Sequence, residues 1–98
     1  MPLSPSQRRY LRGLAHDLKP IVLVGAKGVT PALLQELEVA LDHHELVKVK
    51  VAAEDREAFR TQTAELAERA GAETVQTIGR MAVLYRRNAE EPRLALPR

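Results

Sequence analysis

Apolar residues recur at every third or fourth position in three separate stretches of the chain, which is the spacing of amphipathic helices. Each stretch follows a residue that caps helix N-termini well, namely Ser4, Thr30 and Asp55. Pro20 comes after the first stretch and Gly71 after the third, and both residue types commonly mark the end of a helix. The pattern therefore predicts three helices, over about 5–17, 31–43 and 56–70.

Four shorter stretches have the pattern of β-strands. Ile21–Val24 is apolar throughout, which is typical of a central strand covered on both faces. Glu45–Val51 alternates, so its valines face one side of a sheet and its two lysines face the other. Thr74–Ile78 and Met81–Arg86 are separated by Gly79–Arg80, which fits a two-residue hairpin turn with glycine first.

The predicted elements follow one another in the order αβαβαββ. Strands that are joined through helices pair in parallel with right-handed crossovers, whereas the final hairpin adds an antiparallel pair. We therefore expect an α/β fold, a single compact domain with a four-stranded mixed sheet and three helices. The domain is expected to span residues 1–88. Residues 89–98, with two prolines and alternating charge, are expected to form a flexible, loosely held C-terminal tail.

Composition narrows the classes of function. The 98 residues include no cysteine, which excludes disulfides, thiolate zinc sites and a cysteine nucleophile. Only 3% of the residues are aromatic, so aliphatic side chains must build the core. No apolar run approaches the roughly 20 residues of a membrane span, and the N-terminus lacks the apolar core of a signal peptide. We expect a soluble, cytoplasmic protein with no membrane partner.

Positive and negative charges are separated along the chain, although the net charge is only +2. Residues 1–31 are mostly basic, whereas the charged residues of 32–47 are all acidic. Residues 54–73 are mostly acidic, and basic residues dominate in 48–53 and from 74 onward. A solvated surface of mixed charge is the ordinary explanation, but separation by element also allows one face to be basic and another acidic.

The sequence offers no catalytic or metal-binding constellation. His43 and His44 are adjacent, so on a helix they point about 100° apart and do not share a metal ion. His44 is expected to pack in the buried stripe of the second helix and His43 to lie in solvent. Ser4 and Ser6 have no base nearby that could activate them. We expect no enzyme activity, no catalytic residue, no metal, no cofactor and no small-molecule substrate.

The loop after the first predicted strand carries the most informative motif, Gly25-Ala26-Lys27-Gly28. Its spacing fits neither a P-loop nor a dinucleotide-binding fingerprint. One explanation is a tight strand-to-helix turn in which glycine supplies a positive φ. The other is a Gly-x-x-Gly clamp of the KH type, in which glycines without Cβ atoms let RNA phosphates approach the backbone amides and Lys27 adds charge. The helix that begins after Thr30 would add the positive end of its dipole.

Basic residues on the neighbouring elements favour the clamp. They lie on the first helix, on the second strand and around the hairpin, and such patches supply the salt-dependent part of nucleic-acid affinity. Because aromatic residues are scarce, we expect recognition of RNA backbone and shape rather than base stacking. The predicted RNA-binding residues are Gly25, Ala26, Lys27, Gly28, Arg8, Arg9, Arg12, Lys48, Lys50, Arg80 and Arg86.

Four stretches together resemble the CRM domain (chloroplast RNA splicing and ribosome maturation), in its stand-alone bacterial form, the YhbY-like proteins. The resemblance covers nearly the whole chain, from about Leu3 to Arg87. The matching stretches are Leu14-Ala15-His16 with Leu18-Lys19-Pro20, then Val22–Thr30, then His43–Val51, and finally Ile78-Gly79-Arg80 running into Val83-Leu84-Tyr85-Arg86.

The resemblance implies a fold similar to the C-terminal domain of bacterial translation initiation factor three. It also implies RNA binding through the Gly-x-x-Gly loop and association with precursors of the large ribosomal subunit, while plant relatives act in group II intron splicing. We therefore expect a monomeric RNA-binding protein that acts in large-subunit maturation, with ribosomal RNA of the subunit precursor as its partner. The alternative is a protein-interaction module whose acidic second and third helices dock a basic ribosomal protein.

Overall fold

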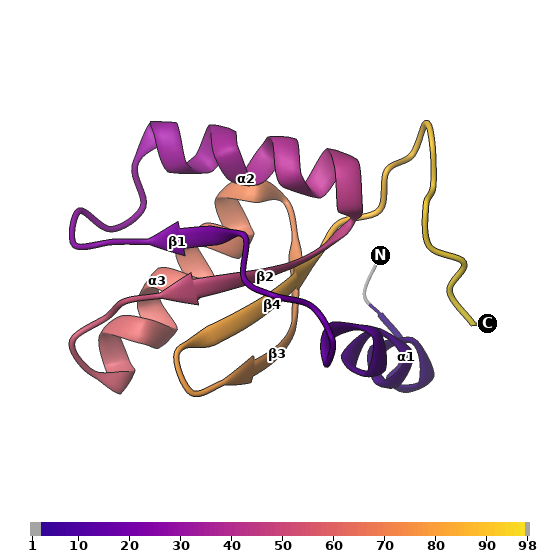
Figure 1. The fold of residues 1–98 in the computed structure, drawn as a ribbon, viewed down its shortest axis with the longest axis horizontal. Coiled ribbons are helices and arrows are strands. Elements are labelled where there is room, and N and C mark those ends of the chain that lie inside the picture. Colours follow the sequence, from indigo (N-terminus) through magenta and orange to yellow (C-terminus); the bar gives the residue numbers. More distant parts are fainter. Residues whose placement is uncertain (1–2, 98) are drawn as a thin grey trace.

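The computed structural model describes residues 3–97, which form three helices and four strands in one mixed sheet (Figure 1). The predicted order αβαβαββ is confirmed. The helices are α1 (Pro5–Ala15), α2 (Pro31–His44) and α3 (Arg56–Ala70), and the strands are β1 (Val22–Val24), β2 (Leu46–Val51), β3 (Glu73–Ile78) and β4 (Met81–Tyr85).

Local sequence signals account for most element boundaries. The Ser4 side chain accepts a hydrogen bond from the backbone of the third helical residue, whose own side chain accepts from the Ser4 N–H, and this capping box begins α1. Thr30 and Asp55 cap α2 and α3 with their side-chain oxygens. Gly71 ends α3 in the left-handed conformation with a φ of 66°. Gly79, with a φ of 57°, opens the two-residue turn between β3 and β4.

The sheet has the strand order β1-β2-β4-β3, with β1 and β2 parallel and the other two pairs antiparallel. The prediction that the apolar run at 21–24 forms a central strand is wrong, because β1 lies at the edge of the sheet. Val22 and Val24 are buried, but Ile21 and Leu23 are 52% and 57% exposed. An apolar run does not reveal what covers its second face, and here that face is open.

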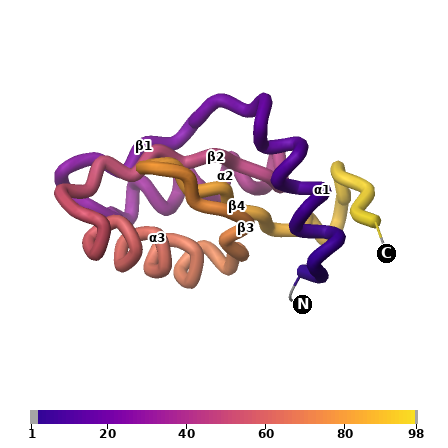
Figure 2. The backbone as a smooth tube through the Cα atoms, turned by 90° about the horizontal axis from the view of Figure 1, so that it is seen from below, coloured from indigo at the N-terminus to yellow at the C-terminus, as the bar shows by residue number. Residues whose placement is uncertain are grey.

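Helices cover the two faces of the sheet unequally (Figures 1 and 2). The larger core lies between one face of the sheet and helices α2 and α3, and it includes the three valines of β2. On the other face, Leu11 and Ala15 of α1 pack with Leu46 of β2 and Val83 of β4. α1 covers only one end of this face, so part of it stays open to a ligand.

Glu45, directly after α2, is fully buried although it is charged. It has a φ of 61°, and its carboxylate accepts hydrogen bonds of 2.6 to 2.7 Å from the backbone N–H groups of Asn88, Arg93 and Leu94. Burial, and then the Glu45 charge, raise the pKa of the Tyr85 hydroxyl, which therefore stays protonated near neutral pH. The sequence analysis took Glu45 as the first residue of a strand and did not predict this role.

The C-terminal segment folds back over α1. Leu94 and Leu96 pack against the core under α1, and the Gln7 side-chain amide donates a hydrogen bond of 3.0 Å to the Pro97 carbonyl oxygen. Residues 89–97 form neither helix nor strand. The sequence predicted a loosely held tail. The structure adds contacts between this segment and both α1 and Glu45, and no local sequence pattern predicts these contacts.

The prediction that His44 packs in the buried stripe of α2 is wrong. His44 is exposed, whereas Leu33, Leu37 and Leu41 of the same helix are buried. The reason is that His44 lies over an open cavity at the end of the sheet and not over the core. No helix among residues 3–97 is both long enough and apolar enough to cross a membrane.

Candidate nucleic-acid interface

The Gly-x-x-Gly loop connects β1 to α2 and forms one tight turn. The Gly28 N–H donates a hydrogen bond of 3.0 Å to the Gly25 carbonyl oxygen, and Ala26 and Lys27 lie exposed between them. Gly28 has a φ of 71°, so the turn needs glycine there, but the φ of Gly25 is not positive. A Cβ on Gly25 would meet nothing within 4 Å, so the space beside its backbone is free for a ligand.

Backbone amides and a helix N-terminus meet at this loop. The turn uses the Gly28 N–H internally, so that group is not available to a ligand. Within the described part of the chain, the N–H groups of Ala26 and Lys27 have no hydrogen-bond partner. α2 begins at Pro31, a few residues beyond Lys27, and the N-terminal end of a helix attracts anions. Free amides, a lysine and a helix N-terminus together suit a phosphate.

Gln62 of α3 lies beside the loop and was not among the predicted residues. Its side-chain nitrogen is 4.0 Å from the position that a Cβ on Gly28 would take. Its side-chain oxygen is buried and has no hydrogen-bond partner among residues 3–97, which is uncommon in folded proteins. The sequence could not predict a role for Gln62. The spacing of apolar residues along α3 does not distinguish a glutamine that lies beside a loop from one that lies in solvent.

The hairpin tip and the end of β2 lie at the same end of the molecule as the loop (Figure 1). The Val51 N–H donates a hydrogen bond of 2.8 Å to the Arg80 carbonyl oxygen. The Ala52 N–H donates one of 2.9 Å to the carbonyl oxygen of Val24, the last residue before the loop. The structure thus brings three predicted sites together, namely the loop, Lys50 and Arg80.

Lys50 belongs to a row of side chains that crosses all four strands on the open face of the sheet. The two ends of this row are the exposed side chains of Leu23 and Ile78, on the two edge strands. The linear sequence does not predict this row, because its members align only once the register of the strands is known. The row consists of Leu23, Lys50, Met81 and Ile78.

The predicted basic residues of α1 lie at the opposite end of the molecule from the loop (Figure 2). Arg9 and Arg12 are exposed there. Arg8 instead holds α1 to β3, because its guanidinium pairs with Glu73 and donates a hydrogen bond of 2.8 Å to the Thr74 carbonyl oxygen. The structure therefore does not gather the α1 arginines with the loop, and Arg8 has partners within the protein.

Arg86 is also occupied by contacts within the protein. Its guanidinium pairs with Glu38 at 2.7 Å and with Asp42 at 2.9 Å, both on α2. It also donates a hydrogen bond of 2.7 Å to the carbonyl oxygen of Ala70 at the end of α3. Arg86 therefore connects the end of β4 to two helices. Its positive charge also offsets the negative charge of Glu38 and Asp42 on α2, the helix through which the alternative function would bind a basic ribosomal protein.

We expect Arg86→Ala to lower the free energy of unfolding by about 2 kcal/mol, because several charge-assisted hydrogen bonds are lost together. The side chain is only 22% exposed, so solvent screens these contacts incompletely. Urea unfolding followed by circular dichroism measures the change, and RNA affinity should stay close to that of the wild type. A fully stable variant with weakened RNA binding would instead place Arg86 in the interface.

Comparison with known proteins shows to which family this chain belongs. The family model of the CRS1 / YhbY (CRM) domain matches residues 3–86. The chain belongs to the CRM family. An RNA-binding protein of Haemophilus influenzae is 48% identical over 96 residues, which is 98% of this chain and 96% of that protein. The Bacillus subtilis protein YqeI, named as a probable RNA-binding protein, is 36% identical over 95 residues, 97% of this chain and 99% of that protein.

A solved structure supports the same assignment. The solution structure of a hypothetical protein from Staphylococcus aureus, a candidate RNA-binding protein, matches this CRM domain with a TM-score of 0.84 and 34% identity. The match covers 98% of this chain and 100% of that one. The family and the fold class predicted from the sequence are therefore confirmed. The family match ends at residue 86, one residue after β4, so all seven elements lie within it.

Proposed function

We propose that this CRM domain is an RNA-binding protein that acts in the maturation of the large ribosomal subunit. The observation that carries the proposal is the gathering of the Gly-x-x-Gly turn, Lys50 and Arg80 at one end of the molecule. Free amides, a helix N-terminus and three cations, Lys27 included, suit the phosphates of RNA. Family membership and the RNA-binding names of the relatives support RNA as the ligand. The ribosomal role rests on the family resemblance.

The contact follows the backbone and shape of the RNA. Phe59 and Tyr85 are buried and Tyr10 lies on α1, so no aromatic ring of the described chain is available at the loop end for base stacking. The turn and its lysine hold phosphates, while Leu23 and Ile78, in the same cross-strand row as Lys50, offer apolar contact to sugars. Recognition by backbone and shape is the ordinary mode for structured RNA.

A second contact of the same RNA is proposed on α1, through Arg9 and Arg12. Lys48 lies on β2 between the two ends, two residues from Lys50 towards α1. A structured RNA that touches both ends lies along the longest axis of the protein, which measures 38 Å. In this proposal residues 1–88 act as a monomer in the cytoplasm, and binding rather than catalysis is the function.

Lys27→Ala is expected to weaken the binding of purified large-subunit ribosomal RNA by about fivefold at physiological salt, because one phosphate contact is lost. The plot of log affinity against log salt should become shallower by about one unit. Lys27 is exposed and forms no ion pair among residues 3–97, so the variant should melt at the wild-type temperature. Filter binding between 50 and 200 mM salt gives both quantities.

Arg93→Ala provides the matched control, because Arg93 is an exposed cation at the far end of α2. Its side chain pairs with the exposed Glu91 and donates a hydrogen bond of 3.4 Å to the Asp42 carbonyl oxygen. Its salt slope should stay near the wild-type value. Equal affinity and slope for Lys27→Ala and the wild type would remove the loop from the interface. The protein-docking alternative is tested by Glu36→Lys on the exposed side of α2: loss of ribosome association in this variant alone would favour that alternative.

A further inference from the structure

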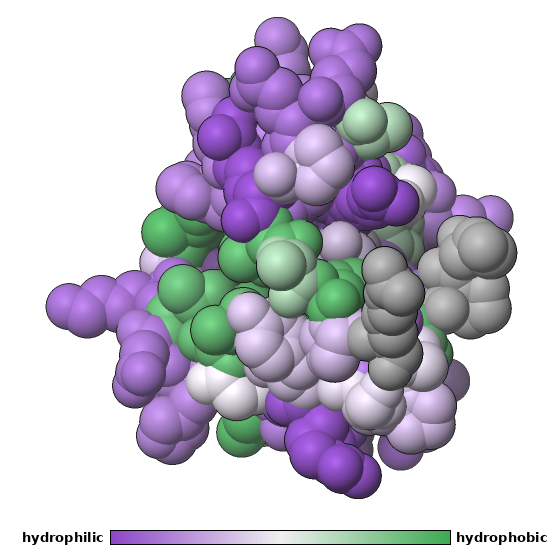
Figure 3. All heavy atoms as spheres, turned by 90° about the vertical axis from the view of Figure 1, so that its right-hand side faces the viewer, coloured by the Kyte–Doolittle hydropathy of each residue, from purple (hydrophilic) through white to green (hydrophobic). Residues whose placement is uncertain are grey.

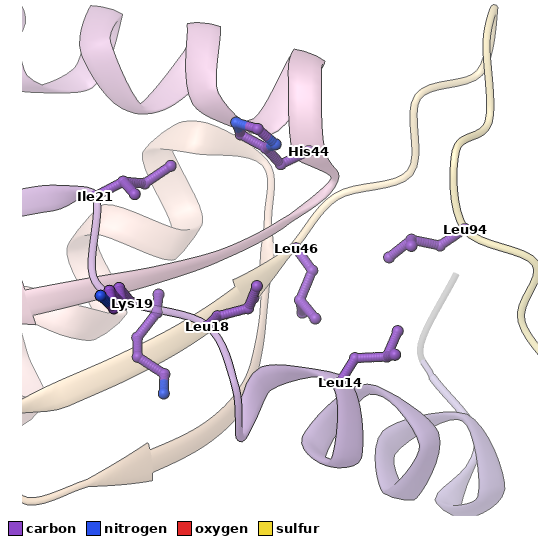
Figure 4. A pocket seen from close by; sticks show the side chains of 8 residues that line it. Leu14, Leu18, Lys19, Ile21, His44, Leu46 and Leu94 are labelled. Atoms are coloured by element: carbon purple, nitrogen blue, oxygen red, sulfur yellow. The ribbon is translucent and has the colours of Figure 1, made fainter.

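An open apolar cavity lies at the α1 end of the sheet, away from the Gly-x-x-Gly loop (Figure 4). It has a volume of about 340 Å³, within the range of pockets that hold ligands. Figure 4 shows side chains around it from α1, the loop after α1, the end of α2, β2 and the C-terminal segment. The aliphatic residues that line the cavity are Leu14 of α1, Leu18 and Ile21 of the following loop, Leu46 of β2 and Leu94 of the C-terminal segment.

Three of the five aliphatic side chains around the cavity are open to solvent, whereas Leu46 is buried. Leu14 is 37% exposed, Leu18 is 38% exposed and Ile21 is 52% exposed. These three residues line one cavity, and Figure 3, which shows the side of the molecule where α1 lies, has a green apolar patch between hydrophilic surfaces. Single exposed leucines are ordinary, but a contiguous apolar patch with a polar border commonly marks a binding surface.

Two cationic side chains, Lys19 and Lys48, lie at the border of the cavity. His44 is the remaining polar residue of the lining. No carboxylate among residues 3–97 lines the cavity. An occupant that is apolar at its centre and acidic at its edges therefore complements both the shape and the charge of the site.

We propose that this cavity is a docking site for an acidic segment of a partner protein that inserts a leucine or phenylalanine side chain. RNA fits less well, because proteins recognise single bases by aromatic stacking and by hydrogen bonds to the base edges, and this lining is almost wholly aliphatic. An apolar side chain in a desolvated pocket is the usual anchor of a protein interface. The strongest RNA contact is proposed at the loop end, so a bound segment competes only with the second RNA contact proposed on α1 and leaves Lys27, Lys50 and Arg80 free for RNA.

The proposal predicts that a synthetic twelve-residue peptide of alternating aspartate and leucine binds the 98-residue protein at this cavity. Methyl-labelled NMR titration should shift the methyl signals of Leu14, Leu18, Ile21 and Leu94 and leave those of Leu23 and Ile78 in place. Leu18→Asp puts a carboxylate among the apolar side chains, so the dissociation constant should rise by at least about tenfold. A peptide with lysine in place of every aspartate should bind about tenfold more weakly than the acidic peptide.

Val39→Asp is the matched control, because Val39 is a 52% exposed aliphatic residue on α2 that does not line the cavity. It should leave peptide affinity at the wild-type level. Thermal melting of both variants shows whether either has lost its fold. If Leu18→Asp unfolds, Ile21→Asp, at a more exposed position of the same cavity, replaces it.

Three results would overturn the proposal. First, the acidic peptide could leave the methyl signals of the cavity residues unchanged. Second, Leu18→Asp could weaken the binding of ribosomal RNA as strongly as Lys27→Ala does, which would assign the cavity to the RNA-binding surface. Third, a wild-type dimer that Leu18→Asp dissociates, seen by sedimentation equilibrium, would make a second copy of this chain the occupant. Lys27→Ala should weaken the binding of RNA and leave the affinity for the peptide unchanged. A failure of the RNA-binding proposal is therefore distinguishable from a failure of this one.

Discussion

Glu45→Ala is expected to lower the free energy of unfolding by about 3 kcal/mol and the melting temperature by roughly 15 °C. The buried carboxylate accepts three backbone hydrogen bonds from the C-terminal segment, and none of them survives in alanine. Each bond to a charged group contributes about 1.5–3 kcal/mol, but the freed N–H groups reach water when the segment detaches, which limits the loss. Urea unfolding and differential scanning calorimetry give both quantities.

Two further variants separate the causes of that loss. Glu45 has a φ of 61°, a conformation that strains residues other than glycine, so Glu45→Gly should be about 1 kcal/mol more stable than Glu45→Ala. Deletion of residues 88–98, which removes all three donors to Glu45, should cost nearly as much as Glu45→Ala. Combining the deletion with Glu45→Ala should add little, because both remove the same contacts. Fully additive losses would show that Glu45 stabilises the protein through contacts other than those with this segment.

Removal of the three cations at the loop end is expected to lower the affinity for large-subunit ribosomal RNA by about 100-fold at physiological salt. The variant combines Lys27→Ala, Lys50→Ala and Arg80→Ala. Each lost phosphate contact weakens binding by about fivefold through counterion release, and three such losses together give about 100-fold. All three side chains are exposed, so the fold should be retained. Fluorescence anisotropy with labelled RNA measures the affinity, and circular dichroism checks the fold.

The matched control removes three exposed arginines from the other end of the molecule. Arg69 lies in the last turn of α3, while Arg87 and Arg93 lie beside the C-terminal end of α2. Replacing all three with alanine changes the net charge by the same amount as the loop-end variant. Similar losses of affinity in the two triple variants would mean that RNA affinity depends on the total charge of the protein and not on the cations at the loop end.

Local signals allowed the sequence to predict the elements and their order. Caps at Ser4, Thr30 and Asp55 act on residues three positions away, so they can be read before any tertiary structure is known. Gly71 and Gly79 likewise mark backbone conformations that glycine favours. The loop motif could be found for the same reason, since its four residues form one turn.

Non-local pairing explains what the sequence could not predict. The place of β1 at the sheet edge depends on which strands pair, and an apolar run at 21–24 carries no information about that. Arg86 and Glu45 resemble surface residues in a linear pattern, yet each meets partners more than 40 positions away. A basic residue near a motif is therefore weak evidence for ligand contact until its partners within the fold are known.

The most direct test of the central claim is sedimentation of a cell lysate through a sucrose gradient, probed for this protein. The wild type and the variant without Lys27, Lys50 and Arg80 are compared in parallel. The account predicts that the wild type travels with the precursor of the large ribosomal subunit and that the variant stays at the top of the gradient. Wild-type protein at the top, or both proteins in the precursor fractions, would contradict it.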